Sequence, residues 1–104
     1  MLNAKIKELQ SLCEFYHLDL RIQYYGDHEV CFKGVTENEK EVFNVAVWYP
    51  PKQIERRFYI ELNSEYEEWT GGQFLKETIL LFLSIDDLSD EELNIKAPYE
   101  MPKE

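Results

Sequence analysis

The sequence contains two cysteines and two histidines, which are residue types that bind structural metal ions. They form two closely spaced pairs, Cys13 with His17 and His28 with Cys31, which together match the ligand set of a structural zinc site. The spacing argues against this chemistry, because residues three apart on a predicted strand, such as His28 and Cys31, point to opposite faces. Cys13 falls on the apolar side of a predicted helix, where a free thiol behaves as a small hydrophobic group. We therefore expect no metal site and no cofactor, and spacing alone does not establish a disulfide.

Catalytic chemistry has little support in the sequence. A cysteine with a histidine could form a nucleophilic dyad, but no local signature accompanies either cysteine. The many carboxylates could supply a general acid and a general base, yet any acidic surface contains such an inventory. The segment Thr70-Gly71-Gly72 precedes a predicted helix and could bind an anion, but Glu67 and Glu68 just upstream would repel a phosphate. We expect a protein that is not an enzyme.

The charge of the chain is strongly acidic and unevenly distributed. The 104 residues include 21 acidic and 11 basic side chains, which gives a net charge of -10. Residues 1–60 contain nine acidic and eight basic side chains, whereas residues 61–104 contain twelve acidic and three basic ones. Such a chain repels nucleic acids and anionic membranes and attracts a basic protein surface. We therefore expect a basic protein partner rather than direct binding to nucleic acid or to a membrane.

Acidic clusters with neighbouring aromatic side chains form the candidate partner-binding site. Carboxylates spaced along a rigid surface can imitate backbone phosphates, and their attraction for a basic partner weakens as salt rises. Aromatic side chains would supply the desolvated anchors of the interface. The alternative is a solvated charged face that keeps a small domain soluble. The candidate residues are Glu61, Glu65, Tyr66, Glu67, Glu68, Trp69, Asp86, Asp87, Asp90, Glu91 and Glu92.

Helices and strands must position these residues. The hydrophobic pattern first has the period of a helix and then the period of strands. Apolar residues at helical spacing predict an amphipathic helix over residues 2–17. Alternation of apolar and polar residues then predicts four strands, over residues 18–25, 29–35, 42–49 and 54–62. A second helix is predicted over residues 73–85, and we expect it to be largely buried because its apolar residues cover more than one stripe. Ser89 and Glu92 have the spacing of a capping box, which predicts a further short helix.

This order of elements favours one α+β domain. We expect a four-stranded antiparallel sheet in α-β-β-β-β-α order with the helices packed mainly on one face, over residues 1–94. Residues 95–104 are expected to form an extended tail. An aromatic patch on the other sheet face is typical of an interaction surface unless other parts of the chain cover it. The residues expected on that face are Tyr25, Arg57, Tyr59 and either Trp48 or Tyr49.

In size, acidic charge and element order, the chain resembles a broad class of small inhibitors from phages and mobile elements. Anti-CRISPR proteins and uracil-DNA glycosylase inhibitors belong to this class. The resemblance implies a stoichiometric inhibitor that blocks the DNA-binding surface of a host defence or repair protein in the host cytoplasm. No sequence motif carries it, so no functional residue is transferred.

The leading expectation for function is therefore an acidic protein that binds and inhibits a basic, nucleic-acid-binding protein. One alternative is an immunity protein or chaperone that covers a toxin or effector with the same acidic surface. Another is a small accessory subunit whose aromatic sheet face forms an oligomer interface, which would include a homodimer. No apolar run approaches the roughly 20 residues needed to span a bilayer, and the first residues lack the apolar stretch of a secretory signal. We expect a cytoplasmic protein.

Overall fold

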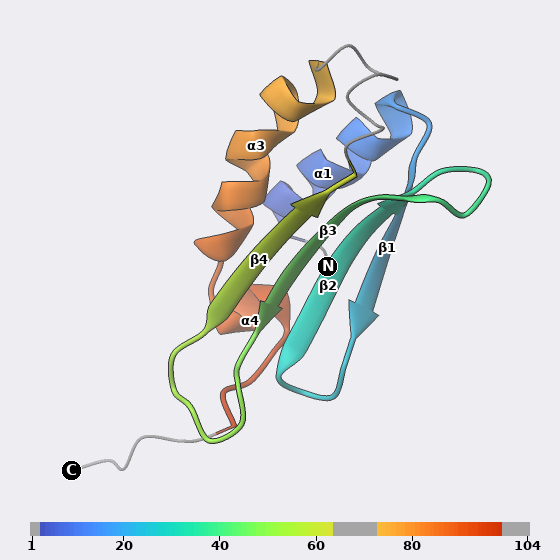
Figure 1. Ribbon diagram of the computed structural model, residues 1–104. Coiled ribbons are helices and arrows are strands. Elements are labelled where there is room, and N and C mark those ends of the chain that lie inside the picture. The colour runs from blue at the N-terminus through green and yellow to red at the C-terminus, as the bar shows by residue number, and fades with distance from the viewer. Residues whose placement is uncertain (1–2, 64–72, 99–104) are drawn as a thin grey trace.

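The computed structural model describes residues 3–63 and 73–98 and confirms the α+β fold class (Figure 1). Helices precede and follow a four-stranded sheet, in the order that the sequence predicts. The elements are α1 (Ala4–Phe15), β1 (Asp19–Tyr24), β2 (Glu29–Val35), β3 (Glu41–Trp48), β4 (Arg57–Leu62), α3 (Gln73–Asp86) and α4 (Asp90–Leu93).

The sheet is an antiparallel meander in which each strand pairs with the next, in the order β1-β2-β3-β4. Both long helices, α1 and α3, lie on one face of it, and α4 lies near one end (Figure 1). The strand residues that face the helices alternate with outward ones, as a period of two requires. Those facing the helix layer are Leu20, Ile22, Val30, Phe32, Phe43, Val45, Val47, Phe58, Ile60 and Leu62.

Helix α1 begins where Asn3 caps it, because the Asn3 side chain accepts a hydrogen bond from the Lys5 backbone N–H at 2.8 Å. Its apolar residues Ile6, Leu9 and Cys13 are buried against the sheet. The helix ends at Phe15, two residues before the predicted boundary at residue 17.

The centre of the core is a close contact between a glycine and an aromatic ring. Gly34 on β2 lies opposite Phe43 on β3, and the Phe43 ring lies over the position that a Gly34 side chain would occupy. The same ring contacts Phe82 of α3, with 5.0 Å between the ring centroids. This stack joins α3 to the middle of the sheet.

Strand β4 begins at Arg57, three residues later than the alternation of side chains predicts. Pro50 and Pro51 open a loop after β3, and Lys52 in this loop has a φ of 60°, which is not extended backbone. Ile54 is 51% exposed and does not contribute to the core. The predicted start of this strand at residue 54 is therefore wrong, because a turn and a long loop occupy residues 50–56.

The chain beyond α4 is attached to the first hairpin. The capping box predicted for Ser89 and Glu92 is present, and it begins α4. Ile95 is 3% exposed in the core, and the Lys96 backbone N–H donates to the Asp27 carbonyl oxygen at 2.7 Å. Residues 95 and 96 thus pack with the domain, although the sequence places the start of a tail at residue 95; residues 99–104 lie outside the described residues.

Candidate interaction surfaces

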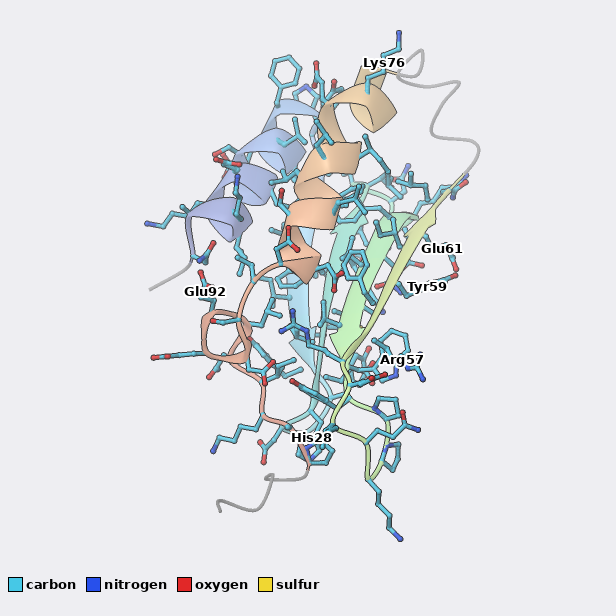
Figure 2. The ribbon with its side chains drawn as sticks, turned by 90° about the vertical axis from the view of Figure 1, so that its left-hand side faces the viewer. His28, Arg57, Tyr59, Glu61, Lys76 and Glu92 are labelled. Atoms are coloured by element: carbon cyan, nitrogen blue, oxygen red, sulfur yellow. The ribbon has the colours of Figure 1, made fainter. Side chains whose placement is uncertain are left out.

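The structure does not bring all the predicted acidic residues onto one surface. Glu61 lies on the sheet face away from the helices, whereas Glu92 lies on the helix side of the molecule (Figure 2). A partner that contacts the α4 region therefore does not contact Glu61 through the same flat surface. The predicted residues Glu65, Tyr66, Glu67, Glu68 and Trp69 lie outside the described residues.

Asp90 is part of a network that fixes α4 to the rest of the fold. Its two carboxylate oxygens accept hydrogen bonds from Arg56 at 2.9 Å and from the Tyr49 hydroxyl at 2.6 Å. Arg56 also donates to the backbone carbonyl oxygen of Asp86 at the end of α3. Partial burial and the bond to Asp90 raise the pKa of Tyr49. Asp90 is thus neutralised by a neighbouring guanidinium, and its first role is structural.

Glu92 and Glu91 line a hollow of about 580 Å³ between the start of α1, β1 and α4. Glu92 accepts hydrogen bonds from the Ser89 backbone N–H and from the Asn3 amide, which hold its carboxylate in place. These bonds, the one from Ser89 first, lower the pKa of Glu92. Glu91 is exposed at the same rim.

The apolar wall of this hollow comes from β1. Ile22 and Tyr24 line it, and the Tyr24 hydroxyl donates to the Leu93 carbonyl oxygen at 3.1 Å. Tyr24 is 48% exposed, so its ring is open to a visiting group. We name this feature the α4 hollow and define it by Asn3, Ile6, Ile22, Tyr24, Glu91, Glu92 and Asn94.

Asp86 and Asp87 are exposed at the C-terminal end of α3. Carboxylates are unfavourable at a helix C-terminus, because the helix dipole is negative there. The last turn of α3 contains no basic residue to compensate. These two aspartates therefore do not stabilise the helix that carries them.

The open face of the sheet has the composition that the alternation of side chains predicts. Val47 is fully buried toward the helices, so Trp48 is the aromatic residue of β3 that faces outward. In Figure 2, Arg57, Tyr59 and Glu61 project from β4 on the side away from the helices. Tyr59 is 44% exposed, and its hydroxyl donates to the Glu61 carboxylate.

Helix α3 has an exposed apolar stripe that the hydrophobic pattern did not predict. Leu80 is 73% exposed, Leu83 is 49% exposed and Ile79 is 38% exposed. The sequence predicts that this helix is largely buried, and for these three residues the prediction is wrong. The helix packs by Thr78, Phe82 and Ile85, and among the described residues nothing covers the opposite side. The pattern contained the signal, since an all-round apolar helix on a one-sided sheet must expose part of its surface.

The cysteines and histidines do not converge. Cys13 of α1 is buried between the helix and the sheet, and Cys31 lies on the sheet face away from the helices. Both thiols are free. The Nδ1 atom of His28 lies 2.6 Å from the Lys96 carbonyl oxygen. Within residues 3–63 and 73–98, no group of three or more metal-binding side chains is found.

Both thiols are expected to resist alkylation in the folded protein. Burial raises the pKa of Cys13 to about 12, and burial and then Glu29 raise that of Cys31 to about 11. At pH 8 only about one Cys31 in a thousand is a thiolate, and the thiolate is the nucleophile. Iodoacetamide should label Cys31 at least about 100-fold more slowly in native protein than in urea, and faster as the pH rises toward 11. Mass spectrometry of the alkylated peptides measures both rates, and equal rates would contradict the burial of Cys31.

Comparison with known proteins gives no relative: no protein-family model, curated protein or solved structure matches this chain. Among the helices of the described part of the chain, none is long and apolar enough to cross a membrane. The function must therefore be inferred from the surfaces themselves.

Proposed function

We propose that this protein is a non-catalytic, acidic inhibitor that binds a basic, nucleic-acid-binding surface of another protein. The observation that supports this proposal is the α4 hollow, where two carboxylates and an exposed aromatic ring line one concave site. This combination fits a lysine or arginine side chain from a partner. Its aliphatic stem would pack on Ile22 and Tyr24, and its charge would meet Glu91 and Glu92.

The framework of the hollow favours such binding. Glu92 is already fixed by Ser89 and Asn3, so little side-chain entropy remains to be lost when a cation arrives. Its lowered pKa keeps the carboxylate charged in mildly acidic solution. The exposed Glu91 at the rim adds a second negative charge, which attracts a basic surface from a distance.

A two-residue variant tests the proposal. Glu91→Lys with Glu92→Gln removes the negative charge of the hollow, and glutamine keeps the capping box that begins α4. We expect this variant to associate with the partner at least about tenfold more slowly than wild type at low salt, and therefore not to retain it in a capture experiment. The matched control, Glu14→Lys with Glu37→Gln, makes the same change of charge at exposed sites away from the hollow.

The measurement is capture from host lysate by the three immobilised proteins at low and high salt. A nucleic-acid-binding protein retained by wild type and control, but not by the hollow variant, supports the proposal. Wild-type protein should then displace nucleic acid from that captured protein. The proposal fails if all three baits retain the same proteins, or if the captured protein keeps its nucleic acid.

A further inference from the structure

Strand β4 is an edge strand with an open side. It pairs with β3 and with no other strand among the described residues, so one row of its backbone N–H and C=O groups has no strand partner. Its inward residues Phe58, Ile60 and Leu62 are only half-buried. An open, regular edge of this kind is a template for pairing with another strand.

The opposite edge of the sheet is protected. On β1, Arg21 forms ion pairs with Asp19 at 3.3 Å and with Glu39 at 2.5 Å. Charged side chains along an edge disfavour pairing with another chain. Strand β4 also carries charged side chains, Arg57 and Glu61, but it differs from β1 in lying beside an exposed apolar stripe of α3.

The apolar stripe of α3 lies on the same flank as the β4 edge. Glu77 marks the side of α3 that faces α1, because it accepts a hydrogen bond from Tyr16 at 2.6 Å. Ile79 is rotated by about 200° from Glu77 around the helix, so it lies on the side away from α1. Leu83 is one turn beyond Ile79 on that side. Figure 1 places α3 alongside β4, and Figure 2 looks onto this flank.

We propose that a second copy of this chain binds here, with the two β4 strands paired antiparallel across a two-fold axis. Residues that are opposite each other in an antiparallel strand pair lie on the same face of the sheet. The possible registers of the two β4 strands therefore differ by steps of two residues. One register places Tyr59 opposite Tyr59 of the second copy. Arg57 is then opposite Glu61 of the second copy, and this pair occurs twice.

Charge selects this register over its neighbours. A shift in one direction places Arg57 opposite Tyr59 of the second copy and moves Glu61 past the first residue of the other β4, so the opposite-charge pair is lost. A shift in the other direction places Arg57 opposite the uncharged Asn63. In the selected register Phe58 and Ile60 also face each other on the helix side, and cross-strand aromatic, apolar and opposite-charge pairs all stabilise a sheet.

The same two-fold axis brings the α3 helices together. They lie antiparallel on one face of a continuous eight-stranded sheet, with Ile79 and Leu83 of each copy covered by the other. Lys76, at one end of the stripe, comes beside Asp86 and Asp87 of the second copy at the other end. The dimer thus buries Ile79 and Leu83 of the exposed apolar stripe and also pairs the charges that flank it.

This inference does not depend on the proposed function, since the α4 hollow lies on the β1 side of the sheet. Charge swaps test it directly. Arg57→Glu places glutamate opposite glutamate twice, and Glu61→Arg places arginine opposite arginine twice. Each single variant should weaken the dimer at least about tenfold, whereas an equimolar mixture of the two should form a heterodimer of near wild-type affinity.

Sedimentation equilibrium gives the dissociation constants, and circular dichroism verifies that each variant is folded. Lys7→Glu, the same charge change on exposed α1, should leave the dimer unchanged. A second variant, Ile79→Asp with Leu83→Asp, should be a folded monomer. The proposal is overturned by a wild-type protein that stays monomeric at the highest attainable concentration, or by single variants that still dimerise normally. It is also overturned if the mixture does not restore the dimer.

Discussion

Phe82→Ala is expected to lower the free energy of unfolding by about 3–5 kcal/mol, because it leaves a cavity between helix and sheet. Phe82 is fully buried, and its ring packs on that of Phe43. A loss of this size is a large fraction of the stability of a domain of about 100 residues. The lost ring would loosen the packing of α3 on the sheet.

The same chemical change at an exposed site is the control. Phe15 on α1 is 72% exposed, and its contact is an edge-to-face arrangement with Tyr16. Phe15→Ala should cost less than about 1 kcal/mol. Urea unfolding followed by circular dichroism measures both variants. If the two lose similar amounts of stability, the buried face of α3 has been assigned incorrectly.

Gly34→Ala is the second large effect, with an expected loss of about 3 kcal/mol from overpacking. An added Cβ would lie 2.1 Å from Cε2 of Phe43 and 2.6 Å from its Cδ2. The ring cannot move aside without leaving Phe82, because all three residues are in the fully packed interior. The substitution therefore disturbs the contact that joins α3 to the sheet.

Gly26 offers a matched comparison for this prediction. It lies in the turn between β1 and β2 with a φ of 67°, and an added Cβ would have no atom within 4 Å. Gly26→Ala should cost only about 1 kcal/mol, from backbone strain alone. Urea midpoints rank the two alanine variants. A Gly34→Ala protein as stable as Gly26→Ala would show that the core adapts to the extra carbon.

The sequence was sufficient to predict the order of the elements and the two faces of the sheet. Alternation in β4 placed Phe58 inward and Tyr59 outward, and both lie as predicted. The start of β4 could not be predicted in this way. The side chain of Arg56 binds Asp90 and the Asp86 carbonyl, which are at least 30 residues away in the sequence. A local pattern has no access to such a contact.

The candidate site shows a similar limit. Neighbouring carboxylates in a sequence share a sign but need not share a role. Asp90 forms an ion pair with Arg56, and Glu92 caps a helix. Among the contacts of the described residues, Glu91 does neither. The apolar pattern of α3 indicates that some apolar residues must be exposed, but which ones depends on how the helix packs on the sheet, and Leu80 and Leu83 lie on the exposed side.

The two proposed surfaces occupy opposite flanks of the sheet. The β4 edge would join two copies, while each α4 hollow would remain at the outer β1 end of the dimer. Two hollows on one rigid particle could engage two basic sites of a partner together. Binding of this kind raises the overall affinity without any new contact.

The central claim is that carboxylates of the α4 hollow attract a basic partner. It is tested most directly by the association rate constant of the captured partner, measured by stopped flow over a series of salt concentrations. We predict that the rates of wild type and of the Glu14→Lys/Glu37→Gln control fall steeply with salt. The Glu91→Lys/Glu92→Gln protein should start slower, depend less on salt and converge with them at high ionic strength. Identical rates for all three proteins at every salt concentration would contradict the claim.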